Sequence, residues 1–270
     1  MSKKARREIP TFETPIIETH CHLDYLDAEQ LSATLAKANE VGIEKIITIA
    51  VSPENLAKVR DLTERADNIW GTQGIHPHEA ELFNADVEAE IRQESSGRKI
   101  LAIGEIGLDY FYDHADRAVQ RIVFEKQLQM AVDCNLPVVI HTREADEDTR
   151  SILENFSASL GGRGVIHSFT SGLPLAEFCI SEGFSIGFNG ITTFNSAQNV
   201  RDVVTATPME KIVLETDAPY LTPVPYRGRP NAPFYLPFIA ETVAGLKEMD
   251  IETFLQQVYL NSENLFFQDS

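Results

Sequence analysis

The chain has 270 residues, of which 43% are hydrophobic and 24% charged, and its formal net charge is −18 at neutral pH. This composition is ample for a buried core, and no apolar run approaches the roughly 20 residues that a membrane-spanning helix needs, so no membrane partner is expected. The acidity argues against tight, non-specific binding along a duplex, because proteins that bind duplex phosphates usually present a basic face. It leaves room for one or two phosphate contacts in a pocket where cations reverse the local field.

The first seven residues are basic but are followed by Glu8 and Pro10 instead of an apolar stretch, so no secretory signal is expected. Residues 1–14 are predicted to form a short mobile tail and residues 15–270 a single domain. The three cysteines are odd in number, widely spaced and without a Cys-x-x-Cys pair. This usage favours reduced thiols in a cytoplasmic protein.

Eight short apolar runs recur along the chain, and helix-compatible segments follow them. Runs such as 46–51 are continuous and rich in β-branched residues, which is typical of strands buried on both faces of a parallel sheet. Alternating strands and helices with short connections imply right-handed βαβ units, and eight strands predict an α/β fold closed into a (β/α)8 TIM-type barrel. The predicted strands cover 16–19, 45–51, 69–75, 99–106, 137–141, 164–167, 184–189 and 211–216. Amphipathic stretches predict helices over 28–40, 54–66, 117–134, 144–160 and 173–182.

The last part of the chain contains two further predicted elements. The Pro- and Gly-rich segment 219–233 follows the eighth strand and is too long for a tight turn, so it is expected to form a functional loop at the barrel mouth. The pattern over 258–267 predicts a closing helix. No low-complexity linker divides the chain.

The first predicted strand runs directly into a His-x-His pair, His20 and His22. Side chains on a strand alternate between its faces, so the two imidazoles point the same way while Cys21 points the other way. Two histidines in this arrangement form a chelating pair for a divalent cation. The pair alone is equally compatible with ordinary polar packing, so its context decides between the two interpretations.

Polar residues also follow most of the other predicted strands, at their C-terminal ends. In a (β/α)8 barrel these ends form the face that carries the active site. Six of the seven histidines fall at these ends, and only His114 does not, whereas chance would scatter them over helices and loops. The predicted metal ligands are His20, His22, Glu105, His141, His167 and Asp217.

Six ligands are too many for a single site that must keep an open position. They suit two divalent cations per chain, with Glu105 placed centrally enough to bridge them. The expected chemistry is hydrolysis by a metal-bound water, with Asp217 as general base, so Glu105 and Asp217 are the predicted catalytic residues. Four imidazoles favour Zn, Mn, Co or Fe, whereas phosphoryl chemistry favours Mg, so the sequence does not distinguish Mg, Mn and Zn.

Four residues are predicted to bind an anionic substrate. Arg143 points to the same side as the ligand His141 and either meets this anion or forms a salt bridge at a helix start. Arg227 and Arg229 form the only basic cluster near the mouth, which indicates a phosphate or carboxylate unless the loop is merely solvated. The predicted substrate residues are His76, Arg143, Arg227 and Arg229.

Three other positions keep two interpretations each. His78 either contacts substrate, as predicted for His76, or caps the turn that follows. Asp24 either orients a ligand histidine or is an ordinary turn residue. The aromatic run 110–112 either stacks a base or sugar or packs within a barrel loop.

Taken together, these motifs resemble the TatD family of metal-dependent hydrolases, within the amidohydrolase superfamily. The resemblance covers about residues 16–267 and implies a TIM-like barrel and, for several members, deoxyribonuclease activity that is often 3′-to-5′ exonucleolytic. The family's metal residues fall on the same six positions reached above, and none is missing. The motifs that carry the resemblance are His20–Asp24, Gly104–Tyr110, Val139–Ala145, Ile166–Phe169, Leu214–Tyr220 and the Arg227 to Asn231 loop.

The loop after the eighth strand departs from the family pattern. It commonly reads Arg-Gly-Lys-Arg-Asn-Glu-Pro, whereas here Pro230 replaces the second basic residue of the Lys-Arg pair and Ala232 the acidic one. The phosphate-binding pattern is therefore present but reduced.

The most favoured function is a divalent-metal phosphodiesterase, a 3′–5′ exonuclease on single-stranded ends, acting on nucleic-acid ends or a small phosphoester. The alternative is hydrolysis of a carbonyl substrate such as an amide, a lactone or a D-aminoacyl-tRNA ester. A metal-binding adaptor without turnover is disfavoured by the complete ligand set. No obligate protein partner is indicated.

Overall fold

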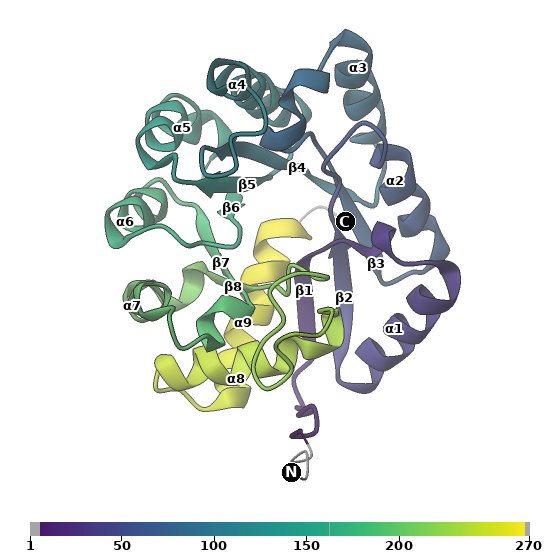
Figure 1. Ribbon diagram of the computed structural model, residues 1–270, viewed down its shortest axis with the longest axis vertical. Coiled ribbons are helices and arrows are strands. Elements are labelled where there is room, and N and C mark those ends of the chain that lie inside the picture. The colour runs from purple at the N-terminus through teal and green to yellow at the C-terminus, as the bar shows by residue number, and fades with distance from the viewer. Residues whose placement is uncertain (1–5, 162, 268–270) are drawn as a thin grey trace.

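The computed structural model describes residues 6–161 and 163–267. Eight parallel strands form one sheet in chain order, each paired with the next, and Figure 1 shows the helices arranged around the outside of these strands. The predicted α/β barrel is therefore confirmed. The strands are β1 Ile16–Cys21, β2 Ile43–Thr48, β3 Ile69–Gln73, β4 Ile100–Asp109, β5 Val138–Arg143, β6 Gly164–Ile166, β7 Ser185–Phe188 and β8 Ile212–Leu214.

The barrel closes where β8 meets β1. The Asp217 amide donates to the His20 carbonyl at 2.9 Å, and Cys21 pairs with Ala218 as an isolated parallel bridge. The buried Glu18 side chain adds a second link, because its Oε1 accepts from the Thr216 amide at 2.9 Å. These contacts bring the two ends of the sheet, which are almost 200 residues apart in sequence, to the same place.

The helices begin where a polar side chain satisfies free backbone N–H groups. Asp27 starts α1 with a capping box to Gln30, and Asp116 accepts from two amides at the start of α4. The ranges predicted for α1 and α4 match, whereas α3, α7 and α8 were not predicted. The helices are α1 Ala28–Glu40, α2 Leu56–Arg65, α3 Ala85–Glu94, α4 Arg117–Cys134, α5 Asp146–Leu160, α6 Leu173–Ser181, α7 Gln198–Ala206, α8 Leu236–Leu246 and α9 Ile251–Phe266.

The lower end of the barrel, at the strand N-termini, is filled by apolar side chains. Val139, Val165 and Val213, one from each of three strands, belong to one buried cluster with Phe266 and Phe267 at the end of α9. Two residues further along these strands come His141, His167 and Glu215. Because side chains alternate along a strand, the apolar interior leads directly to a polar layer at the opposite end. That polar layer lines the mouth.

The predicted tail, residues 1–14, lies partly outside the described residues. Residues 6–14 lie against the barrel: the Arg7 guanidinium pairs with Glu241 on α8 at 2.7 Å, and the Thr14 amide donates to Glu252 on α9 at 2.9 Å. Ile9 packs against the apolar core. In the described chain, no helix has both the length and the apolar character needed to cross a membrane.

Candidate active site

The six predicted ligands converge at the C-terminal ends of the strands. Five of them line a cavity of about 580 Å³, and the sixth, His20, is fully buried at its base. The walls of the cavity come from the C-terminal ends of all eight strands and the segments that follow them. Candidate ligands from residue 20 to residue 217 are thus collected at one pocket by the closure of the barrel.

The first part of the cluster comes from the two ends of the sheet. His20 Nε2 lies 3.8 Å and His22 Nε2 3.5 Å from Asp217 Oδ1. All three side chains offer a ligand atom within 4.8 Å of one another. Asp217 has the left-handed backbone conformation, with φ of 56°, at the turn that follows β8.

Glu105 lies between this group and a second one. Its Oε2 faces His20 Nε2 at 3.4 Å, whereas its Oε1 faces His167 Nε2 at 2.8 Å and His141 Nδ1 at 3.1 Å. The two oxygens of one carboxylate therefore face different imidazole nitrogens, and Glu105 belongs to two candidate ligand groups, one with His20 and His167 and one with His76 and His141. This is the geometry expected of a ligand shared by two cations.

Asp109 determines which nitrogen of His141 faces the cavity. Asp109 Oδ2 lies 2.9 Å from His141 Nε2, so that nitrogen carries the proton and donates it, and the Nδ1 lone pair points at Glu105. Asp109 Oδ1 accepts from the amides of Phe111 and Tyr112, which fixes the carboxylate in place. Carboxylates that hold a ligand histidine in this way are common around protein-bound metals.

The donor set fits a cation for a further reason. Both nitrogens of His20 are buried and make no hydrogen bond within the described chain. An unpaired polar atom in a protein interior is costly, and here the unpaired atoms are imidazole nitrogens beside carboxylate oxygens. Imidazole and carboxylate are the ligands that divalent transition-type cations accept.

The protonation states agree with this fit. Burial raises the pKa of Glu105, but the imidazoles of His167 and His76 outweigh burial and hold that pKa well below its ordinary range. Burial likewise raises the pKa of Asp217, and the hydrogen bond from His22 overcomes it, so this carboxyl is also ionised. Burial lowers the pKa of His20, which keeps its lone pairs free. The ligands are thus held in the forms that bind cations.

Two histidines beside Glu105 have raised pKa values, which favour the protonated form that cannot bind a cation. Burial lowers the pKa of His167, but the negative charges of Glu105 and Glu215 raise it well above its ordinary value. The pKa of His141 is also raised, because the hydrogen bonds to Asp109 and Glu105 exceed the effect of burial. Cations and protons therefore compete for the same nitrogens, and acid is expected to weaken metal binding.

Among the predicted substrate residues, His76 lines the cavity. Its Nδ1 accepts from the His78 amide at 3.1 Å, so the proton is on Nε2, which lies 3.4 Å from Glu105 Oε1. Burial lowers the pKa of His76 to about 4, so the ring is a neutral hydrogen-bond donor near neutral pH. Of the two interpretations of His78, the structure does not support capping: His76 caps this turn, and His78 Nε2 lies 3.1 Å from Asp109 Oδ2.

The three predicted arginines are placed differently. Arg143 lines the cavity, with its guanidinium over the rings of Phe111 at 4.0 Å and Tyr112 at 4.8 Å. Arg227 lies over Phe194 at 4.0 Å, and neither it nor Arg229 is among the residues that line the cavity. The role of all three in substrate binding stays a prediction.

Sequence reasoning assigned no role to Glu215, which supports the site from below. Its Oε1 accepts from the Ser168 amide at 2.6 Å and lies 3.4 Å from His167 Nδ1. Gly187 is required here, because a Cβ at that position would come within 2.6 Å of Glu215 Oε2. The signal was present in the Glu-x-Asp spacing that ends at Asp217, since alternate residues share one face.

The sequence pattern assigned no role to His114 and left two alternative roles for Asp24. His114 is the one histidine that does not follow a predicted strand. Its ring stacks on that of His78 with centroids 4.5 Å apart, so it lies at the edge of the cluster. Asp24 accepts from Asn55 at 3.1 Å, and its contacts in the described chain include no ligand histidine, which favours the interpretation as a turn residue.

The barrel and this cluster of histidines and carboxylates define a metal-dependent hydrolase. The sequence pattern of the family described as TatD-related DNase matches residues 17–267. The chain belongs to this family.

Relatives extend over nearly the whole chain. An uncharacterized metal-dependent hydrolase of Bacillus subtilis (strain 168), YabD, is 34% identical over 255 residues, which are 93% of this chain and 98% of that protein. A protein of Erwinia amylovora named 3′-5′ ssDNA/RNA exonuclease TatD is 35% identical over 245 residues, covering 88% and 94%. The crystal structure of the TatD homologue YJJV from Escherichia coli K12 has a TM-score of 0.88 at 31% identity, covering 93% and 97%.

Proposed function

We propose that this hydrolase is a phosphodiesterase that holds two divalent cations and removes nucleotides from single-stranded 3′ ends. The observation that carries the proposal is the position of Glu105, whose two oxygens face different imidazole nitrogens. The name of the Erwinia relative, an exonuclease on single-stranded DNA and RNA, supports the choice of substrate.

Each part of the cluster has a role in this proposal. His20, His22 and Asp217 would hold one cation, His141 and His167 would hold the other, and Glu105 would be shared between them. Bound divalent cations supply Lewis acidity, which acidifies water and stabilises negative charge on phosphoryl oxygens. Asp217 has a lowered pKa, because the hydrogen bond from His22 outweighs burial, and as an ionised carboxylate it accepts the proton that the attacking water loses.

The substrate contacts follow from the side chains at the cavity wall. The neutral His76 offers its Nε2 proton to a phosphoryl oxygen or to Glu105. Arg143 makes no ion pair with the described residues, so its charge is free for a phosphate beside the scissile bond.

We also propose that the reaction takes place in the cytoplasm. The three cysteines form no disulfide, and reduced thiols are expected of a cytoplasmic protein.

The test is a gel assay of metal-stripped protein, resupplied with Mg²⁺ or Mn²⁺, on 5′-labelled single-stranded DNA with a free or blocked 3′ end. Stepwise shortening that requires both the cation and the free end is expected. Duplex DNA of the same sequence should be a poorer substrate. If protein shown to contain metal cleaves neither substrate, the phosphodiesterase assignment is wrong, and carbonyl substrates such as lactones or D-aminoacyl-tRNA esters become the next to assay.

A further inference from the structure

The exposed aromatic side chains of this protein are concentrated at the cavity. Nine large hydrophobic side chains are exposed in the described chain, and the four aromatic ones are Tyr25, Phe111, Tyr112 and Tyr220, each 49–52% exposed. Three of these rings line the metal cavity, and Phe111 lines the adjoining pocket. A soluble protein has no need for four exposed rings at one mouth, so their position calls for a ligand.

One pair of rings lies beside the first group of ligands. Tyr25 ends the 3₁₀ turn after β1, and Tyr220 comes from the loop after β8; their ring centroids are 6.2 Å apart and their planes nearly perpendicular. Tyr25 also stacks on the ligand His22, with centroids 5.5 Å apart. This contact fixes one face of Tyr25 against the cluster and leaves the rest of the ring exposed.

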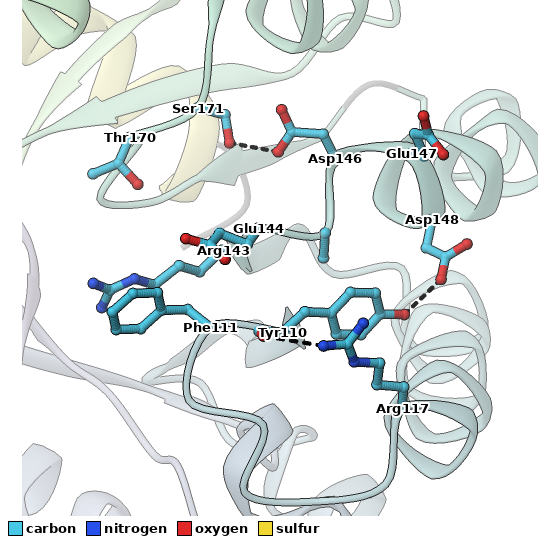
Figure 2. Close-up of a pocket in the computed structure, with 11 residues that line it drawn as sticks. Tyr110, Phe111, Arg117, Arg143, Glu144, Asp146, Glu147, Asp148, Thr170 and Ser171 are labelled. Atoms are coloured by element: carbon cyan, nitrogen blue, oxygen red, sulfur yellow. Dashed lines mark hydrogen bonds between the residues drawn. The ribbon is translucent and has the colours of Figure 1, made fainter.

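The second pair lies beside His78 and Asp109: the Tyr112 and His78 ring centroids are 5.5 Å apart, and the amides of both residues of the pair donate to Asp109 Oδ1. Phe111 and Tyr112 follow β4 and are edge to face, with centroids 4.9 Å apart. Figure 2 shows the Arg143 guanidinium lying flat over the Phe111 ring, in agreement with its distance of 4.0 Å from the centroid. Arg143 thus holds one face of the pair and carries a positive charge between the rings and the cavity.

Acidic side chains border this second pair on its outer side. The pocket next to Phe111 is lined by four carboxylates and by two arginines, Arg117 and Arg143, so its lining is acidic on balance. Figure 2 shows two of the carboxylates, Asp146 and Asp148, held by Ser171 and Tyr110. Carboxylates repel phosphates, so a nucleic-acid backbone gains nothing by extending across this surface. A nucleic acid that binds to the rings would therefore gain its affinity there from contacts between its bases and the rings.

We propose that the two aromatic pairs are base-stacking platforms that hold the two nucleotides on either side of the scissile phosphate. Each platform takes one unpaired base, and Arg143 contacts a phosphate between them. Aromatic rings stack on any base, so the platforms select for single strands without selecting a sequence. This inference rests on the proposed nuclease function, because it names the part of the substrate that the same site binds.

Stacking can be measured without turnover. Short single-stranded oligonucleotides with 2-aminopurine at the terminal or the penultimate 3′ position, joined by a non-cleavable linkage, are titrated with the metal-loaded protein, and fluorescence quenching reports stacking. Quenching at both positions is expected, and Tyr25→Ala with Tyr220→Ala should abolish it at one position while Phe111→Ala with Tyr112→Ala abolishes it at the other. Ile122→Ala and Leu260→Ala, which remove exposed side chains on α4 and α9, serve as controls. These two variants should quench 2-aminopurine fluorescence as strongly as the unmodified protein does.

Kinetics with abasic substrates give the second measurement. Replacing either base by an abasic sugar should raise KM by roughly 5- to 100-fold, the range that corresponds to loss of one base–aromatic stack. The matching double variant should then raise KM no further on that substrate. Because the acidic border excludes extended phosphate contacts, KM should also change little between 50 and 200 mM salt.

The outcomes separate the two proposals. Cleavage of intact and abasic DNA with equal KM, or the same KM increase on both substrates in the platform variants, overturns the platforms and leaves the nuclease function standing. Quenching that depends on the four rings, in a protein that cleaves no DNA with any cation, supports the platforms and overturns the proposed reaction.

Discussion

The two ends of the barrel are built from the same eight strands but are chemically opposite. At the lower end, Val139, Val165 and Val213 pack against Phe266 and exclude water. At the mouth, residues two positions further along the same strands are candidate ligands or support them, and buried nitrogens of His20, His22 and His167 make no hydrogen bond in the described chain. The first arrangement stabilises the fold, whereas the second leaves polar atoms free for a cation.

This difference shows how one architecture separates stability from chemistry. The apolar end is satisfied by its own packing and needs no ligand. At the mouth, the negative charges of Glu105 and Asp217 are buried among imidazoles. These charges need protons on the imidazoles, or bound cations, to balance them. Substitutions at the mouth should therefore lower activity, whereas substitutions at the lower end should lower the stability of the fold.

The largest effect is expected at the mouth. Asp217→Asn keeps the size of the side chain but removes the proton acceptor, so kcat should fall about 10²- to 10⁴-fold while the thermal midpoint stays the same or rises. The matched control is Asp202→Asn on the exposed face of α7, which should retain full activity. Normal turnover by Asp217→Asn would show that this carboxylate is not the base.

The next effect belongs to the lower end. Phe266→Ala removes a ring that is 5% exposed and should lower the free energy of unfolding by about 3–5 kcal/mol, measured in urea. Activity of the folded fraction should change little. Leu260→Ala, on the exposed side of the same helix, should cost at most about 0.5 kcal/mol. Loss of activity without loss of stability in the Phe266 variant would break the comparison between the two ends.

A smaller effect tests the support around the ligands. Asp109→Asn keeps an oxygen for the amides of Phe111 and Tyr112 but presents an N–H group to His141 Nε2, which disturbs the tautomer. Affinity for the second cation should fall roughly 10- to 100-fold, as measured by competition with a chromogenic chelator. Asp113→Asn, an exposed position four residues further on, is the control and should bind metal normally.

The smallest effect lies outside both ends. Hydrogen bonds from the backbone amides of Glu13 and Thr14 lower the pKa of Glu252. Because the folded pKa is lowered, this contribution to stability is present above the ordinary pKa of 4.5 and is lost as the pH falls through the folded value. Glu252→Gln should therefore lower the melting temperature slightly at pH 7 and less at pH 3. The same decrease at both pH values would contradict the assignment, and Glu125→Gln on α4 is the control.

The sequence predicted the barrel and the convergence of the six candidate ligands because both depend on strand alternation. A strand fixes where every second side chain points, so the sequence alone places His20, His141 and His167 at one mouth. The helices α3 and α7 were given no predicted ranges, because each combines a short length with only two or three buried side chains. The equally short α2 and α6, which were predicted, bury four side chains each.

The parts that could not be predicted come from loops. Tyr25 and Tyr220 are almost 200 residues apart and meet only because β8 closes on β1. The capping role of His76 was not predicted, because the choice between His76 and His78 depends on the backbone angles of a single turn. The position of Arg227 over Phe194 likewise follows from the path of the loop after β8, which residue spacing does not encode.

The two-cation centre is tested most directly by the metal content of Mn²⁺-loaded protein, combined with its electron paramagnetic resonance spectrum. Two Mn²⁺ ions per chain and a spin-coupled signal are expected, because Glu105 joins the two groups of candidate ligands. Glu105→Gln should lose the coupling. One ion per chain, or two ions with no coupling in the parent protein, would contradict the claim that this mouth is a two-cation centre.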